Sequence, residues 1–221
     1  RGLFKACMQE LMDSLTNDEV IYVFPNKSSL HGTEKIGFQQ TDQIPFYGKM
    51  VFRKLENSQT EFSPSCHFSL KQDIYAKALA IKNKVMIYRD AAYMNWRYNS
   101  HPYASYYSHS AIHHEQVTGN IVVRSVKFKQ RKYLLLMEFH SLNKKAEQEM
   151  LIFLRKVAFI ENCSLAGLFS NNESQTNFLA TGMVKVPSLL LPKKQILMTY
   201  KKGSIALKND IWFCQTGDWD A

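Results

Sequence analysis

The stretch FPNKSSLHGTEKIGF (Phe24–Phe38) recurs later in this chain in a related form. It begins at the end of the apolar run Val20–Phe24, turns at a proline and an asparagine, and ends on a glycine followed by a phenylalanine. A second apolar run, Leu165–Phe169, starts the related copy. Three pairs of identical residues lie 145 positions apart: Phe24 and Phe169, Asn26 and Asn171, and Gly37 and Gly182. A strand, turn, helix and glycine that repeat at the spacing of a domain predict a duplicated fold.

The composition is that of a globular chain. Of the 221 residues, 45% are hydrophobic and 13% are aromatic, which allows a substantial core and excludes a disordered chain. No apolar run reaches the roughly 18–20 residues of a membrane-spanning helix, so we expect no membrane insertion. The chain opens on Arg1-Gly2 without a charged and apolar leader. We therefore expect a cytoplasmic protein, and we expect this chain to be a fragment or a processed form.

The net charge of +9 favours an anionic partner, such as a phosphate-rich cofactor, nucleic acid or a membrane surface. The charge alone does not choose among them. Paired lysines are dispersed along the chain, which is typical of solvated faces rather than of one dense binding patch: Lys144-Lys145, Lys193-Lys194 and Lys201-Lys202. We therefore expect a phosphate-rich small molecule before nucleic acid.

The cysteines and histidines do not indicate a metal site. The four cysteines lie far apart and are expected to be reduced and mostly buried: Cys7, Cys66, Cys163 and Cys214. His109 and His113 would share one face of a regular strand, but no cysteine or carboxylate completes a metal-binding spacing in the sequence around them. We expect no metal.

Hydrophobic periodicity predicts an α/β protein. Helices are predicted over 2–15, 26–37, 73–82, 90–98, 143–159 and 173–181. Strands are predicted over 20–24, 38–44, 47–55, 104–113, 119–128, 132–139, 164–169, 185–191 and 195–200. Asp90 and Asn143 are expected to cap their helices, and the apolar run Tyr133–Met137 suits a central strand covered on both faces.

Residues 56–66 are polar and turn-forming and form the best linker candidate in the chain. We assign residues 1–55 to the C-terminal half of a first domain and residues 67–221 to a second domain. Because the helix at 146–159 corresponds to the one at 1–14, the first copy lacks the elements that precede this helix in the second. We expect the first copy to be incomplete, and an exposed half-domain could pair with another chain as a homodimer.

An amphipathic helix preceded by Arg-Gly, then a strand, then an asparagine-led helix ending in Lys-Ile-Gly-Phe, resembles the second half of a GNAT acetyltransferase domain. The resemblance implies tandem GNAT-like copies, each with a mixed central sheet flanked by helices. In that family a loop and the following helix N-terminus hold the pyrophosphate of acetyl-CoA, which suits the orphan N–H groups of a helix start. Six cofactor-binding residues are implied: Arg1, Gly2, Leu3 and Phe4 in the loop, and Asn26 and Ser29 at the helix that flanks the pantetheine arm.

The segment YMNWRY (Tyr93–Tyr98), with His101-Pro102 and Tyr106, resembles a signature of a bacterial two-copy GNAT subfamily that is associated with surface-polysaccharide synthesis. The ending Trp212–Asp220 resembles the end of the same subfamily. The family often places a general-acid tyrosine four residues before the glycine of the asparagine-led helix, and Thr33 stands there. The catalytic base and acid are therefore unassigned.

The second copy has no glycine between His140 and Lys145, where its phosphate loop should lie. Close backbone approach to phosphate favours glycine, so we expect that this copy does not bind CoA in the family manner. Arg97, Tyr98 and Glu138 are its candidate substrate contacts, although Arg97 could equally satisfy carbonyl groups and Glu138 could be an ordinary strand residue. Trp96 is expected, together with Tyr93, to pack the helix.

The resemblance implies acyl transfer from acetyl-CoA to a small-molecule amine, such as an amino sugar. A base would take the amine proton, the amine would attack the thioester, and backbone donors would stabilise the oxyanion. Two alternatives are open. The positive net charge suits an aminoacyl-tRNA-dependent transferase of the same tandem architecture. Thr33, in place of the general-acid tyrosine, suits a non-catalytic binding module.

Overall fold

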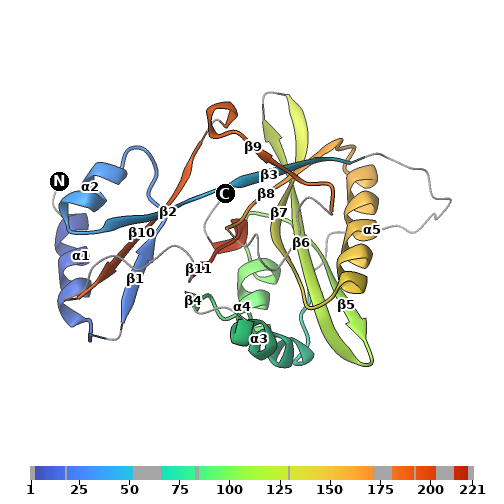
Figure 1. The fold of residues 1–221 in the computed structure, drawn as a ribbon, viewed down its shortest axis with the longest axis horizontal. Helices are drawn as coiled ribbons and strands as arrows, with labels where there is room; N and C mark the ends of the chain where they lie inside the picture. The colour runs from blue at the N-terminus through green and yellow to red at the C-terminus, as the bar shows by residue number, and fades with distance from the viewer. Residues whose placement is uncertain are drawn as a thin grey trace. The chain divides into compact units, whose positions relative to one another are not determined.

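The structure is a computed structural model that describes residues 3–17, 19–51, 66–82, 85–128, 130–171, 181–191, 193–202 and 212–218. The chain forms two compact units (Figure 1). The first unit comprises 1–45 and 188–211, and the second comprises 46–187 and 212–221. Both contain helices and strands, which confirms the predicted α/β class. Within the described residues, no helix is long and apolar enough to cross a membrane.

The first unit is a three-stranded antiparallel sheet with two helices. Its strand order is β1-β10-β2, so a strand from late in the chain lies between two early ones. The elements are α1 (Leu3–Ser14), β1 (Val20–Val23), α2 (Leu30–Lys35), β2 (Gln39–Ile44) and β10 (Gln195–Lys201). The core of this unit contains Met12, Ile36, Phe38 and Met198.

The repeat in the sequence is also a repeat of structure. β1 and β8 (Leu165–Phe169) start 145 residues apart, and so do β2 and β9 (Val184–Val186). The two repeated glycines both adopt positive φ angles, +101° at Gly37 and +76° at Gly182. Residues with a Cβ rarely adopt this conformation, so each glycine allows the same turn of the backbone in its own copy. The duplicated unit is thereby confirmed.

The second unit is built on a six-stranded mixed sheet with the order β5-β6-β7-β8-β3-β9. Among the described strands of this sheet, β7 and β8 are the one parallel pair, and the other neighbours are antiparallel. Besides β8 and β9, the sheet contains β3 (Phe46–Met50), β5 (Tyr107–His113), β6 (Gln116–Phe128) and β7 (Arg131–Ser141).

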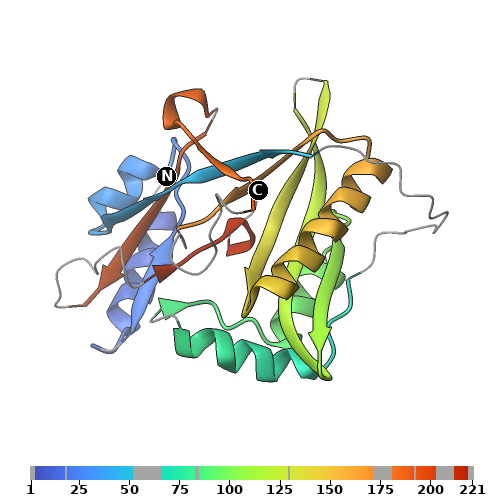
Figure 2. The same ribbon diagram turned by 45° about the vertical axis from the view of Figure 1, so that its right-hand side comes forward.

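Strand β7 is covered on both faces, as the run Tyr133–Met137 predicted. Leu134 and Leu136 belong to a core that includes residues of α5 (Lys144–Ile160), whereas Met137 packs in a second core with Met94. Because successive strand residues point to opposite faces, the two cores lie on the two sides of the sheet. Figure 2 shows α5 crossing one of these faces.

Helix starts in the second unit follow the predicted caps. Asp90 begins α4 (Ala91–Met94), and its carboxylate accepts the N–H of Tyr93 at 2.7 Å. Asn143 begins α5, and its Oδ1 accepts the N–H of Ala146 at 2.9 Å. Each bond satisfies one of the N–H groups that a helix start leaves without a partner. Both caps are confirmed.

Helix α4 continues into a π-helical turn, Asn95–Asn99. The N–H of Ser100 reaches back five residues to the carbonyl oxygen of Asn95 at 2.9 Å. Such turns are rare and often occur at functional sites. This one carries Arg97 and Tyr98, two of the predicted substrate contacts.

In each unit, one strand comes from the chain that follows the other copy of the repeat. β3 follows the first copy and pairs in the second unit, and β10 follows the second copy and pairs in the first unit. β2 continues past Pro45 into β3, which pairs with β8 and β9 in the second unit. β10, which follows β9 and the 3₁₀ turn Ser188–Leu190 in the chain, pairs with β1 and β2 in the first unit. The predicted division places residues 46–50 in the first domain. The predicted boundary between 55 and 56 lies outside the described residues, and the division into 1–55, 56–66 and 67–221 stays a prediction.

One predicted strand is shorter than expected. β9 ends at Val186, Pro187 follows, and Ser188–Leu190 form a 3₁₀ turn. Proline has no N–H to donate to a strand neighbour, which explains why 185–191 is not one strand. The remaining elements are α3 (Lys71–Lys82), β4 (Val85–Met86), β11 (Trp212–Phe213) and the 3₁₀ turn η4 (Thr216–Asp218). The helix predicted over 173–181 lies almost wholly outside the described residues.

Candidate functional site

The start of α1 is the first candidate site. Arg1 and Gly2, and the side chain of Phe4, lie outside the described residues. Leu3 is the first residue of α1 and is 79% exposed. The first turn of α1 contains no acidic residue and carries the exposed Lys5. The described part of this helix start therefore has no charge that opposes an anion.

Asn26 and Ser29 form the turn between β1 and α2. The Oδ1 atom of Asn26 accepts the N–H groups of Ser28 and Ser29, each at 2.9 Å. The Oγ atom of Ser29 accepts the N–H of Asn26 at 3.0 Å. These bonds fix the chain where it leaves β1, and they bring the two predicted contact residues together. Asn26 is exposed there.

The equivalent helix start in the second unit carries charges of both signs, from Lys144, Lys145 and Glu147. The Asn143 cap already uses the N–H of Ala146. Glu147 places a carboxyl group in the first turn of α5, where its charge would repel a phosphate. These features add to the absence of glycine between His140 and Lys145.

The two parallel strands of the second unit separate early. β7 and β8 pair at two positions, Leu134 with Ala166 and Leu135 with Gly167. Beyond these pairs, the facing backbone groups need other partners, because a buried N–H or C=O without a hydrogen bond is costly. The segment Trp212–Asp218 supplies these partners.

Hydrogen bonds from this segment reach both strands. The side-chain amide of Gln215 donates to the carbonyl oxygen of Phe139 at 2.7 Å and accepts the N–H of Phe139 at 2.9 Å. The Oγ1 atom of Thr216 accepts the N–H of Phe169 at 2.9 Å. Phe139 belongs to β7 and Phe169 to β8, so the segment bridges the separated strands.

A buried ion cluster holds the same segment. Arg89 has no exposed surface, and its Nε donates to Glu138 at 2.8 Å while its Nη2 donates to Asp218 at 2.6 Å. The hydroxyl of Tyr98 donates to the second oxygen of Glu138 at 2.7 Å. The guanidinium also lies over the ring of Phe213, with Cζ 4.8 Å from the ring centroid.

Glu138 and Asp218 both bind the guanidinium of Arg89, and their pKa values move in opposite directions. Burial opposes ionisation of Glu138, but Arg89 and His140 outweigh it and hold the pKa of Glu138 well below its ordinary value. Burial raises the pKa of Asp218 to about 6; Arg89 offsets this in part, and the nearby charge of Glu138 adds to it. Glu138 therefore carries the firm negative charge, and Asp218 takes up a proton more readily.

The structure brings two of the three predicted substrate contacts together. Tyr98 is 3% exposed and Glu138 is fully buried, and they are bonded to each other. Arg97 is half-buried, and its Nε donates to the carbonyl oxygen of Gly217 at 3.1 Å. The polar atoms of Tyr98 and Glu138 are engaged within the protein in this state, so their role as substrate contacts stays a prediction.

Arg89 is the centre of the cluster, and sequence reasoning missed it. The one available signal was a basic residue that directly follows the run Val85–Tyr88. Trp96 packs against the ring of Tyr93, as expected, with 5.9 Å between the ring centroids, while 66% of its surface stays exposed. Residues two apart on a helical turn point to opposite sides, and Tyr98 takes the inward position.

His109 and His113 meet a carboxylate from another element. The Nε2 atoms of these histidines lie 2.6 Å and 3.3 Å from the two carboxylate oxygens of Glu149 on α5. The sequence could not show this contact, because Glu149 is far from both histidines along the chain. In the part of the chain that the structure describes, no group of three or more His, Cys, Asp or Glu residues could hold a metal ion.

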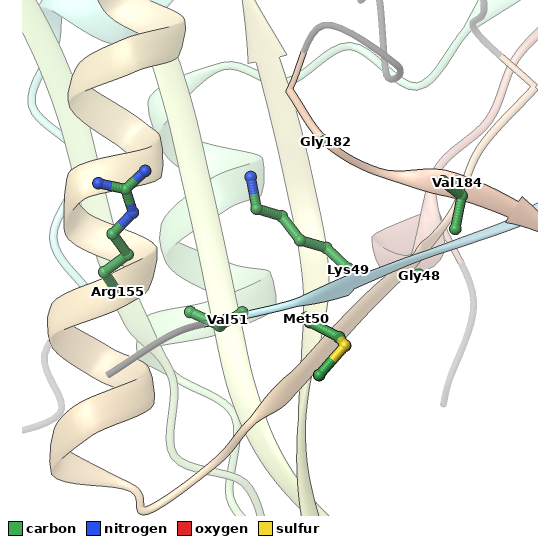
Figure 3. A pocket seen from close by; sticks show the side chains of 7 residues that line it. All are labelled: Gly48, Lys49, Met50, Val51, Arg155, Gly182 and Val184. Carbon is green, nitrogen blue, oxygen red and sulfur yellow. The ribbon is translucent and has the colours of Figure 1, made fainter. Parts of the chain in front are cut away.

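A pocket of about 540 Å³ lies beside α5 in the second unit (Figure 3). Lys49 from β3 and Arg155 from α5 both extend toward it. The amino group of Lys49 donates to the carbonyl oxygen of Thr181. The other described lining residues are Gly48, Met50, Val51, Gly182 and Val184. Two cations at the rim of an otherwise apolar pocket can attract a small anion.

Arg155→Met is expected to raise the pKa of Lys49. Burial lowers this pKa, and the positive charge of Arg155 lowers it further, so removing that charge favours the protonated lysine. The measurement is an NMR titration of the Lys49 side chain. Lys156→Met is the matched control, because Lys156 is exposed on α5 and is not among the pocket residues. Equal pKa values in wild type and Arg155→Met would contradict the coupling.

Solved structures share this fold at low sequence identity. One is the crystal structure of a GCN5-related N-acetyltransferase from Anabaena variabilis ATCC 29413, with a TM-score of 0.56 and 13% identity over 90% of this chain and 49% of that one. The fold is that of a GNAT protein. A conserved protein of unknown function from Enterococcus faecalis V583, a probable N-acyltransferase, also has a TM-score of 0.56, with 14% identity over 91% of this chain and 50% of that one.

The chain spans about half the length of these two GNAT-fold structures. No protein-family model and no curated protein sequence matches it. The mixed sheet flanked by helices, predicted from the resemblance to GNAT proteins, is confirmed. At this level of identity the likeness concerns the fold, and the chemistry has to be argued from the chain's own residues.

Proposed function

We propose that this protein is an N-acyltransferase that uses an acyl-CoA, with acetyl-CoA as the first candidate, and that its cofactor site lies in the first copy. The GNAT fold carries the proposal, together with the repeat that places a helix, a strand and an asparagine turn in the first copy at the same spacing as in the second. The resemblance of Tyr93–Tyr98 to a two-copy subfamily supports an amino sugar as the acceptor amine.

The two copies differ in their fit to a phosphate-rich cofactor. The described first turn of α1 has a lysine and no acidic residue, whereas that of α5 has Lys144, Lys145, Glu147 and an asparagine cap. A helix N-terminus attracts anions most when no nearby carboxylate competes. The first copy is favoured for the pyrophosphate of a CoA because its helix start has no described carboxylate, and because the second copy lacks a glycine that would let the backbone approach phosphate closely.

The residues that would hold the cofactor are Arg1, Gly2, Leu3 and Phe4 at the start of α1, and Asn26 and Ser29 at the turn after β1. The cofactor would supply the acyl group as a thioester. The N–H groups at the start of α1 would bind phosphate oxygens, and the exposed Asn26 would contact the arm that leads to the thioester. No catalytic base or acid is assigned among these residues.

Leu3→Glu is expected to weaken acetyl-CoA binding about tenfold, because a carboxylate at the N-terminus of α1 repels the pyrophosphate. Isothermal titration calorimetry measures the affinity. The same charge at a helix N-terminus favours the helix itself, so the thermal stability of the variant should not fall. A loss of affinity together with unchanged stability separates repulsion from misfolding.

Leu11→Glu is the matched control. Leu11 is also on α1 and is 46% exposed, but it lies about 12 Å from Leu3 along the helix axis. At that distance salt screens most of the repulsion, so the affinity should stay within about twofold of wild type. Equal weakening by both variants would contradict a site at the helix start. An absence of acetyl-CoA binding at millimolar concentration would contradict the proposed function itself.

A further inference from the structure

The segment Trp212–Asp218 is hydrogen-bonded to Asn171, the residue that corresponds to Asn26 in the second copy of the repeat. Asn171 is 145 residues after Asn26, and its Oδ1 accepts the N–H of Cys214 at 2.8 Å. In return, the N–H of Asn171 donates to the carbonyl oxygen of Cys214 at 3.3 Å. Ser170 forms an antiparallel bridge with Gln215. The segment therefore runs antiparallel to the chain just after β8 and is joined to it by one β-bridge.

The same segment also satisfies β7, through the two bonds between Gln215 and Phe139. Gln215 and Thr216 are fully buried between the strands. The fit leaves no space at Gly217, where a Cβ atom would lie 2.6 Å from a carboxylate oxygen of Glu138 and 2.9 Å from the carbonyl oxygen of Met137. Nothing as wide as a substrate arm could share this space with the segment.

Asp218 fixes the segment at its end. One of its carboxylate oxygens accepts from Arg89, and the other accepts the N–H of Gln215 at 2.7 Å. Withdrawing the segment would break the bond to Arg89 and take a carboxylate away from a guanidinium that is fully buried. Removing one partner of a buried ion pair is strongly unfavourable. The segment is therefore built into the fold and does not act as a mobile lid.

We propose that the segment Trp212–Asp218 permanently closes the space between β7 and β8 to any ligand, and that the chain binds one acyl-CoA, on its first copy. The closure follows from the contacts within the second unit. The statement about a single acyl-CoA rests in addition on the proposed function. On this view the second copy has kept the GNAT fold and filled its own interstrand space with its own chain.

Amide hydrogen exchange on the full chain, read residue by residue by NMR, tests the closure without any ligand. In Gln215→Ala the exchange of the Phe139 amide should accelerate at least tenfold, and in Thr216→Val the same should hold for Phe169. Thr118→Val is the matched control, because this half-buried hydroxyl bonds to Ala111, away from the segment. Unchanged exchange at Phe139 and Phe169 would overturn the closure.

Adding 1 mM acetyl-CoA to the wild-type chain tests the consequence. We expect calorimetry to give one acetyl-CoA per chain and the exchange of the Gln215 amide to stay slow. Two acetyl-CoA molecules per chain, or faster exchange at Gln215 on binding, would overturn the closure. If acetyl-CoA does not bind at all, the proposed function fails, while the exchange rates of the variants still decide whether the segment closes the second copy.

Discussion

Replacing Arg89 by methionine is expected to lower the free energy of unfolding by about 3–5 kcal/mol at pH 7. Methionine keeps much of the side-chain volume but leaves Glu138 and Asp218 in the interior without the cation between them. Urea denaturation measures the change. In the variant both carboxyl groups bind a proton more tightly in the folded state than in the unfolded state, so the loss should be smaller at pH 5 than at pH 7.

Arg155→Met is the matched control for this change. It removes the same charge from the same unit, but Arg155 is exposed and has no carboxylate partner among the described residues. Its effect on the free energy of unfolding should stay within about 0.5 kcal/mol. Similar losses from the two variants would show that the buried cluster does not hold the second unit together.

Gly217→Ala is expected to lower the free energy of unfolding by about 3 kcal/mol. The added Cβ would lie 2.6 Å from Glu138 and 2.9 Å from the backbone oxygen of Met137, and it would also meet the hydroxyl of Tyr98. A backbone oxygen cannot rotate away as a flexible side chain can, so the segment has to shift and the ion cluster with it. Thermal and urea denaturation measure the loss.

Gly32→Ala is the matched control, and its effect should have the opposite sign. Gly32 lies within α2, and a Cβ built there meets nothing within 4 Å. Alanine favours a helix over glycine, so the free energy of unfolding should rise by about 0.5–1 kcal/mol. A loss of stability at Gly217 that did not exceed the change at Gly32 would contradict the tight fit of the segment.

The helices and strands of this chain could be predicted because their signals are local. The apolar stripe of α5 lies within seventeen residues, and Asp90 and Asn143 cap the N–H groups of residues three positions on. The strand prediction at 185–191 failed at Pro187, where the missing N–H outweighs the apolar pattern around it. The packing of Trp96 against Tyr93 could be predicted because the two residues are three positions apart on one helix.

The candidate site could be predicted only in part. Tyr98 and Glu138 were singled out from separate motifs, and the structure joins them by one hydrogen bond. Arg89 was not found, because its role depends on two carboxylates that are 49 and 129 residues away along the chain. No pattern in the sequence around Arg89 records such partners.

By itself the sequence determined the repeat at 145 residues, the glycine turn in each copy and the absence of glycine at the start of α5, because these depend on local backbone conformation. Only the tertiary structure decided that β3 joins the sheet of the second unit, that β10 joins the sheet of the first, and that the segment Trp212–Asp218 lies between β7 and β8. Strands that are distant in sequence pair because their buried N–H and C=O groups need hydrogen-bond partners. The segment Trp212–Asp218 is held in addition by the ion pair between Arg89 and Asp218. These choices are made by packing in three dimensions, not by neighbours in the chain.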